Sequence, residues 1–152
     1  MGRVVTTKGR IKAISVSERK GVPKRNVAEA FLEVEHGIAG DAHAGPGHRQ
    51  VSLLSAESIE ELQAKGLNVA AGDFAENITT QGLDIQMLQV GDVLKINGQI
   101  RLEITQRGKK CHSRCGVFQR LGECIMPREG VFARVTQSGS IRVGDVIEVE
   151  HD

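Results

Sequence analysis

Apolar and polar residues alternate with a period of two along most of this chain. Because successive side chains of a strand point to opposite faces of a sheet, this pattern predicts half-buried strands. Between residues 28 and 34, alternation of the apolar positions favours a strand over a short helix. The other predicted strands cover residues 10–16, 50–54, 92–96, 99–105, 130–136, 140–143 and 146–150.

The strongest local signal is a β-hairpin whose two strands are joined by Asn97-Gly98. This pair is preferred in two-residue type I′ turns, because both positions need a positive φ angle. Polar side chains at alternate positions are expected to face water. The predicted buried face consists of Leu94, Ile96, Ile100, Leu102 and Ile104.

One helix is predicted in the segment SAESIEELQAKG. Ser58 and Glu61 have the spacing of a capping box, and Gly66 is a typical C-terminal stop. Ile59 and Leu62 form a narrow apolar stripe on it. A second short helix is expected over residues 115–121.

Glycine-rich polar segments separate these elements. The segment 20–26 is predicted as a basic loop, and 37–50 and 72–77 as loops without regular structure. Strands are many and short, and they do not alternate steadily with helices. The sequence therefore predicts one domain over residues 1–152, of mainly β class: a barrel-like, mostly antiparallel fold with a few short helices.

Composition narrows the functional classes. Apolar residues make up 39% of the chain and charged residues 26%, as in soluble globular proteins. The net charge is +1, and four Phe with no Trp or Tyr leave few rings for base stacking, so no nucleic-acid partner is expected. The N-terminal residues lack a signal-peptide core and no long apolar run occurs, so we expect a cytoplasmic protein without a membrane partner.

All three cysteines lie in the basic segment QRGKKCHSRCGVFQRLGEC, residues 106–124. Cys111 is flanked by Lys109, Lys110, His112 and Arg114. Neighbouring positive charge lowers the pKa of a thiol and increases the fraction of nucleophilic thiolate. The sequence thus offers a reactive cysteine at position 111, with ordinary reduced cysteines beside a solvated charge run as the alternative.

A second candidate is the glycine-rich loop that contains Asp41, His43, His48, Arg49 and Gln50. Its backbone lets a phosphate or pterin-like group approach closely, and Arg49 offers a planar fork for phosphate or carboxylate. The alternative is a surface loop whose Asp and His side chains satisfy its own turns.

Zinc is a third possibility, since Cys111, His112, Cys115 and Cys124 are all residue types that zinc accepts. Their spacing differs from the paired C-x2-C knuckles of most structural zinc sites. A serine-hydrolase elbow, a P-loop and a dinucleotide fingerprint are absent from the sequence, so acyl transfer, nucleotide hydrolysis and Rossmann-type binding have no support.

Several short motifs occur together in a specific order from about residue 37 to 149. Taken together they resemble the MOSC family, the domain found at the C-terminus of molybdenum cofactor sulfurases and in standalone bacterial proteins. The motifs are Gly40-Asp41-Ala42-His43-Ala44-Gly45 with Arg49-Gln50, Gly72-Asp73-Phe74 with Glu76-Asn77, Val90-Gly91-Asp92, Thr105-Gln106 leading to Cys111, Gly130-Val131-Phe132-Ala133-Arg134-Val135, and Gly144-Asp145.

The resemblance implies a β-rich barrel and a cysteine, here Cys111, that carries sulfur as a persulfide or ligates the molybdenum of a bound molybdopterin cofactor. A soft thiolate suits both roles. For the cofactor phosphate the resemblance and the charges suggest Arg49, Lys109, Lys110 and Arg114. For orienting polar contacts they suggest Asp41, His43, Glu76 and Asn77.

The chain departs from the family's pattern in several ways, and the extra Cys115 and Cys124 leave open which thiol is the active one. Lys110 stands where many relatives have proline before the cysteine, and the upstream pyridoxal-phosphate desulfurase domain of the sulfurases is missing. Pyridoxal phosphate is therefore expected on a partner, such as a cysteine desulfurase or a molybdoenzyme under maturation, and not on this chain.

The leading hypothesis is a domain that binds molybdenum cofactor through Cys111. It would serve cofactor maturation by sulfur transfer, or reduction of N-hydroxylated or N-oxide compounds. The alternatives are a non-catalytic persulfide carrier, in which Cys115 would be the resolving thiol, and a small β domain with structural zinc.

Overall fold

The computed structural model describes residues 7–19, 24–108 and 129–150. These residues form eleven strands, one α-helix and one short 3-10 helix. The strands are β1 (Lys8–Val16), β2 (Arg25–Val27), β3 (Glu29–Glu33), β4 (Gly37–Ile38), β5 (Val51–Ser55), β6 (Ile78–Gln81), β7 (Val93–Ile96), β8 (Ile100–Arg107), β9 (Val131–Gln137), β10 (Gly139–Arg142) and β11 (Val146–Val149). The helices are α1 (Ala56–Ala64) and the 3-10 helix η1 (Ile85–Met87).

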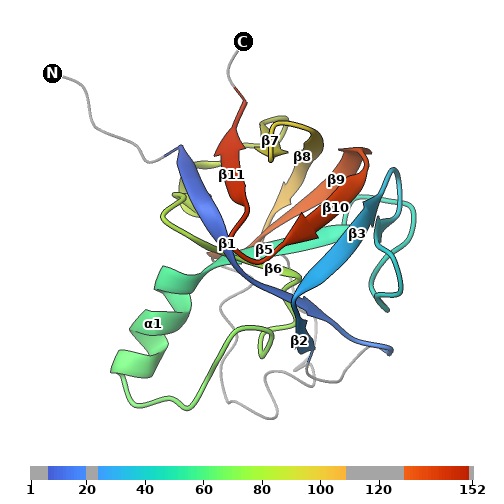
Figure 1. The fold of residues 1–152 in the computed structure, drawn as a ribbon. Helices are drawn as coiled ribbons and strands as arrows, with labels where there is room; N and C mark the ends of the chain where they lie inside the picture. Colours follow the sequence, from blue (N-terminus) through green and yellow to red (C-terminus); the bar gives the residue numbers. More distant parts are fainter. Residues whose placement is uncertain (1–6, 20–23, 109–128, 151–152) are drawn as a thin grey trace, which may run out of the picture.

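Seven of these strands close into a barrel (Figure 1), in the order β11-β7-β8-β9-β5-β6-β1, with β1 pairing back to β11. Strand β2 extends the sheet beyond β1, and β10, β3 and β4 form a separate small sheet. Neighbouring strands in the described residues are antiparallel except for β5 and β6, which run parallel. The parallel pair follows from the crossover through α1, because two parallel strands cannot be joined by a tight turn. The predicted mainly β, mostly antiparallel barrel is confirmed.

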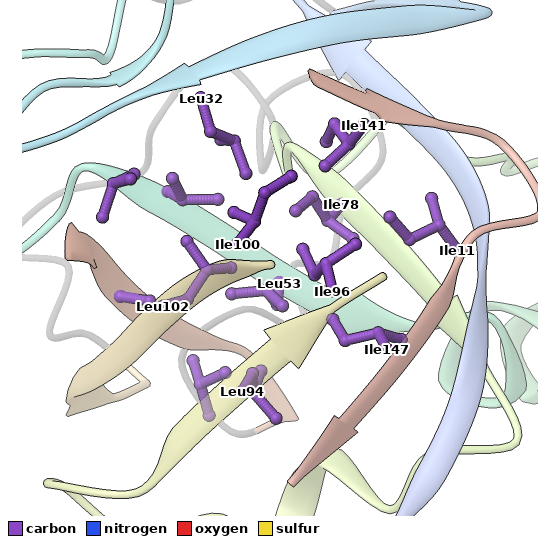
Figure 2. Close-up of a cluster of buried hydrophobic side chains, with 14 of the residues drawn as sticks. Ile11, Leu32, Leu53, Ile78, Leu94, Ile96, Ile100, Leu102, Ile141 and Ile147 are labelled. Atoms are coloured by element: carbon purple, nitrogen blue, oxygen red, sulfur yellow. The ribbon is translucent and has the colours of Figure 1, made fainter. Parts of the chain in front are cut away.

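The barrel interior is filled by aliphatic side chains from every strand of the ring (Figure 2). On β5, Val51 and Leu53 point inward and are fully buried, and Ile78 of β6 lies beside them. Each such side chain stabilises the fold by about 1.5–3 kcal/mol relative to an exposed one. Because this interior is filled with aliphatic side chains, a polar site is expected on the outer faces of the strands.

A second, smaller apolar cluster lies outside the barrel, where α1 covers part of the sheet (Figure 1). Ile59 and Leu62 form the predicted stripe of the helix and are both buried. They pack with Leu54, Phe74 and Phe132. The chain neighbours of Leu54 and Phe132 on β5 and β9 belong to the barrel interior. The outer cluster thereby anchors the loop before β6 and the outer face of β9.

The predicted hairpin and helix are both present, with one correction. Asn97 and Gly98 have φ angles of 56° and 72°, as a type I′ turn requires. Helix α1, however, is capped by Ser55, whose side chain accepts from the backbone N–H of Ser58. The capping box predicted from Ser58 is therefore wrong, because Ser58 already lies inside the first turn.

Four smaller predictions differ from the structure or fall outside the described residues. Residues 25 and 26, predicted as loop, belong to β2, and residues 37 and 38 form β4, because both pair with a neighbouring strand. The strand predicted over residues 28–34 is shorter in the structure, because Val34 lies beyond the end of β3 and is 48% exposed. The helix predicted over residues 115–121 lies outside the described residues.

Candidate functional site

A row of residues crosses the outer face of the barrel from β8 to β1. Gln106 of β8 pairs with Phe132 of β9, and Phe132 pairs with Ser52 of β5. Asn77, just before β6, donates its backbone N–H to the Ser52 carbonyl and accepts from the backbone N–H of Ser15 on β1. Sheet pairing therefore brings residues that are far apart in the sequence into one line across the barrel surface.

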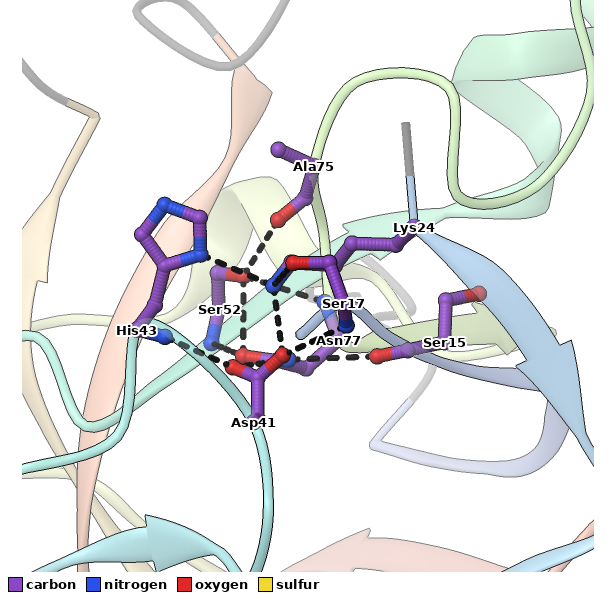
Figure 3. A network of polar contacts seen from close by, with 8 residues as sticks. All are labelled: Ser15, Ser17, Lys24, Asp41, His43, Ser52, Ala75 and Asn77. Carbon is purple, nitrogen blue, oxygen red and sulfur yellow. Dashed lines mark hydrogen bonds and ion pairs between the residues drawn. The ribbon is translucent and has the colours of Figure 1, made fainter. Parts of the chain in front are cut away.

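Asp41 is at the centre of a buried polar network at one end of this row (Figure 3). Its Oδ1 accepts from the backbone N–H of Ser17 at 3.0 Å and from Lys24 Nζ at 2.7 Å. Its Oδ2 accepts from Asn77 Nδ2 at 3.1 Å and from the backbone N–H of His43 at 3.3 Å. Four donors thus surround one carboxylate, which fills its usual capacity.

These contacts decide the charge of Asp41. Burial acts to raise the pKa of its carboxyl group, but hydrogen bonds from Lys24 and Ser17, the Lys24 charge and the bond from Asn77 outweigh it. The pKa of Asp41 is therefore held below its ordinary value of 3.8, and the group is a carboxylate at neutral pH. The alternative that Asp41 only satisfies turns in its own loop is wrong, because three of its four partners lie outside that loop.

Lys24 is the functional candidate that the sequence did not single out. Its side chain is fully buried and contacts Asp41, Ser17 Oγ at 3.3 Å and His43 Nδ1 at 2.8 Å. Burial lowers the pKa of Lys24 below its ordinary value, and the hydrogen bond and charge of Asp41 oppose that shift. In the sequence Lys24 is one of several cations in a basic segment, and no local signal indicates that it alone folds inward.

Asn77 connects the network to the strands on either side. Its Nδ2 also donates to the Ser15 carbonyl at 3.2 Å, while its Oδ1 accepts from the backbone N–H of Ser52 at 3.0 Å. Both ends of the amide are therefore used, and the two ends cannot be exchanged. The predicted orienting residue Asn77 is brought together with Asp41 and His43.

Glu76, the neighbour of Asn77, is also fully buried but has a different set of partners. Its carboxyl oxygens accept from the backbone N–H of Gly72 at 2.9 Å and of Phe74 at 3.2 Å, and from Thr79 Oγ1 at 3.0 Å. Burial raises the pKa of Glu76 above its ordinary value of 4.5, against the effect of these hydrogen bonds. Glu76 thus holds the loop that presents Asn77, and a contact of its own with a cofactor stays a prediction.

Arg49 lies at the other end of the row, on the surface. Its Nε donates to Gln106 Oε1 at 3.1 Å, and its guanidinium carbon is 5.4 Å from the centroid of the Phe132 ring. This distance is within the range of a cation–π contact. In the described part of the chain no acceptor is bonded to its two terminal nitrogens, so the outer edge of the guanidinium can receive a bidentate anion.

The cysteine-bearing segment begins close to this arginine. Gln106 Nε2 donates to the carbonyl of Gly108 at 2.8 Å, and the Gly108 N–H donates to the carbonyl of Gly130 at 2.7 Å. The site residues predicted between Gly108 and Gly130 lie outside the described residues, so their roles stay predictions. They are Lys109, Lys110, Cys111 and Arg114, together with His112, Cys115 and Cys124 of the zinc hypothesis.

Residues 7–19, 24–108 and 129–150 contain no group of three or more His, Cys, Asp or Glu side chains placed to hold a metal ion. Within the same residues, no helix has the length and apolar character needed to cross a membrane.

Comparison with known proteins identifies the family. The sequence matches the MOSC domain over residues 39–148, which is more than half of the chain, whereas no curated protein matches it. The protein therefore belongs to the MOSC domain family, a family associated with the molybdenum cofactor.

Solved structures share the fold at low sequence identity. The YuaD protein of Bacillus subtilis is 18% identical, with a TM-score of 0.76 over 93% of this chain and 95% of that one. YiiM of Geobacillus stearothermophilus is 19% identical, with a TM-score of 0.71 over 94% and 75% of the two chains. YiiM of Escherichia coli is also 19% identical, with a TM-score of 0.64 over 94% and 70%.

Proposed function

We propose that this MOSC domain binds a molybdenum cofactor, with Arg49 holding the phosphate of the pterin and Cys111 providing a thiolate ligand. The observation that carries the proposal is the position of Arg49. Its guanidinium is fixed on Phe132 by Gln106, and Gln106 in turn binds Gly108, from which the cysteine segment continues. The Arg49 guanidinium, which can bind an anion, is thus linked through Gln106 to the start of the cysteine segment.

The described residues fit such a group. A phosphate needs paired N–H donors in a plane, and the outer edge of Arg49 offers them. Fixing one side of the guanidinium beforehand reduces the entropy lost on binding. Lys109, Lys110 and Arg114 would add positive charge to the same phosphate.

The buried network has a supporting role in this proposal. Asp41 binds Ser17, just after β1, and Asn77, just before β6, so two other segments hold the glycine-rich loop that leads to Arg49. His43, on the same loop, would contribute a polar contact to the ligand. Molybdenum, when bound, would supply a redox-active centre with affinity for oxygen and sulfur.

Two uses of the bound cofactor follow from this arrangement. In maturation, a partner desulfurase carrying pyridoxal phosphate would load sulfur onto Cys111. In reduction, the site would accept N-hydroxylated or N-oxide compounds. Both uses require the cofactor to be retained by the protein, which makes retention the property to test first.

The test is to express the protein in a host that makes the cofactor and to measure bound molybdenum, pterin and zinc. The wild type should carry stoichiometric molybdenum and pterin, and Cys111→Ser should lose both. Arg49→Gln should bind the pterin about tenfold or more weakly, since it removes a charge-assisted contact. Arg142→Gln is the matched control, because Arg142 is an exposed arginine whose ion pair is with Glu29.

Other outcomes would overturn the proposal in favour of its alternatives. Persulfide on Cys111 without bound metal would identify a sulfur carrier. Zinc at full occupancy without pterin would identify a structural metal domain. Equal pterin retention in Arg49→Gln and Arg142→Gln would show that Arg49 does not hold the phosphate.

A further inference from the structure

The hydrogen bonds of the buried network permit only one placement of its protons. Asp41 receives four donors, two of which are backbone N–H groups that cannot reverse their role. Asn77 cannot be turned around, because its Oδ1 faces the Ser52 N–H and its Nδ2 faces the Ser15 carbonyl. Asp41 is thus an anion that receives an N–H from Asn77.

The charge of Lys24 follows from that of Asp41. If Lys24 became neutral, the buried Asp41 carboxylate would lose its paired cation, at a cost of several kcal/mol. As an ammonium, Lys24 has three N–H groups, and the network offers three acceptors: Asp41 Oδ1, Ser17 Oγ and His43 Nδ1. Donors and acceptors match one to one.

From this match we infer that Lys24 fixes His43 as the neutral tautomer with its proton on Nε2. An ammonium has no lone pair, so the 2.8 Å contact requires His43 Nδ1 to be the acceptor. A neutral imidazole then carries its single proton on the other nitrogen. Figure 3 shows that other nitrogen on the side of the ring away from Lys24 and Asp41.

The tautomer determines what His43 can do for a ligand. An Nε2 that carries a proton donates a hydrogen bond, and it has no lone pair for a metal ion or for taking up a proton. His43 can therefore donate a hydrogen bond to an acceptor on the ligand, such as a phosphate oxygen. Lys24 is a positioning residue that acts through His43. The role toward a ligand rests on the proposed function, whereas the tautomer itself does not.

Long-range proton–nitrogen correlation NMR on ¹⁵N-labelled protein without cofactor tests the tautomer directly. The chain has five histidines, and the His43 signals are assigned by their disappearance in His43→Gln. We expect an unprotonated Nδ1 and a protonated Nε2 in the wild type. A proton on Nδ1, or on both nitrogens, at neutral pH would overturn the inference.

Two variants show whether Lys24 is the cause. In Lys24→Met, His43 should lose its single tautomer and give the mixed signals of an ordinary histidine. In Lys65→Met, which removes an exposed lysine after α1, the His43 signals should not change. An unchanged tautomer in a folded Lys24→Met protein would refute the role of Lys24. If that variant does not fold, the wild-type spectrum still decides the tautomer.

Inorganic phosphate serves as the probe for the ligand. Added phosphate should shift the His43 Nε2–H signal, and it should shift the Arg49 side-chain signals in the wild type but not in Arg49→Gln. A shift at Arg49 without one at His43 would show that His43 does not face the anion. If the wild type binds the cofactor but His43 is not protonated on Nε2, only this inference is refuted. If His43 is protonated on Nε2 but the wild type binds no cofactor, only the proposed function is refuted.

Discussion

The two faces of the barrel strands are stabilised by different interactions: apolar packing on the inner face and a polar hydrogen-bond network on the outer face. Inside the barrel, Val51 and Leu53 of β5 belong to a buried cluster of aliphatic side chains. Between them in the sequence, Ser52 points outward and joins Asn77, through which it is linked to Asp41 and Lys24. Both faces are buried, yet one is held by apolar contact and the other by hydrogen bonds between specific partners.

The difference lies in how each face responds to change. An apolar interior tolerates exchanges of similar volume, because its contacts are not directional. A buried charge network does not, because removing one partner leaves another uncompensated. We therefore expect the barrel to determine the stability of the fold and the network to determine the geometry of the site.

The largest effect is expected from breaking the buried ion pair. Lys24→Met should lower the free energy of unfolding by about 3–5 kcal/mol, because it leaves the Asp41 carboxylate buried without a cation. Chemical denaturation measures the change. The double variant Lys24→Met/Asp41→Asn should recover part of it, since the unpaired charge is gone. A loss below about 1 kcal/mol in the single variant would show that the pair is not buried in solution.

Adjacent residues of β5 give the direct comparison of the two faces. Leu53→Ala should cost about 2–5 kcal/mol, because it opens a cavity inside the barrel. Ser52→Ala should cost about 0.5–1.5 kcal/mol, because it removes side-chain hydrogen bonds to Asn77 and Ala75 but keeps the backbone pairing. Urea denaturation of both variants checks the ranking, and a reversed order would contradict the assignment of the faces.

The pH dependence of stability separates the two buried carboxylates. The pKa of Asp41 is lowered in the folded state, so its contribution is present above pH 3.8 and is lost as pH falls through the lowered value. The pKa of Glu76 is raised, so its contribution is present below pH 4.5 and is lost as pH rises through the raised value.

Free energies of unfolding measured across this pH range, with Asp41→Asn and Glu76→Gln as references, test both signs. The difference between wild type and Asp41→Asn should shrink as the solution becomes acidic below pH 3.8. The difference between wild type and Glu76→Gln should shrink as pH rises above 4.5. Parallel curves for the two variants would contradict the opposite shifts.

The smallest effect on stability is expected at the exposed end of the row. Arg49→Gln removes an exposed cation–π contact and one hydrogen bond, so the free energy of unfolding should fall by about 1 kcal/mol or less. Phosphate binding, measured by NMR titration, should weaken at the same time. A large loss of stability would show that Arg49 serves mainly to hold the fold together.

The local predictions that proved correct depend on neighbours in the sequence. Asn97-Gly98 and the alternation around it define the hairpin, since the turn conformation and the period-two pattern are properties of adjacent residues. The apolar stripe of α1 was likewise readable from residue spacing. Ordered motifs carried the family assignment, which the match over residues 39–148 confirms.

The sequence identified Asp41, His43 and Asn77 as candidate polar site residues but could not show that they share one hydrogen-bond network. Their partners come from β1, from β5 and from the residue before β2, so only the closing of the barrel brings them within hydrogen-bond distance. Lys24 was missed for the same reason, because burial of a charged side chain depends on a partner 17 positions away.

The amino-acid sequence by itself determined the fold class, the turns and the types of chemistry available, because these follow from local conformational preferences and from side-chain composition. Only the tertiary structure decided which cation is buried and how Arg49 is held. The physical reason is that desolvation and hydrogen-bond geometry depend on distances between strands, and the sequence contains those distances only through the folded barrel.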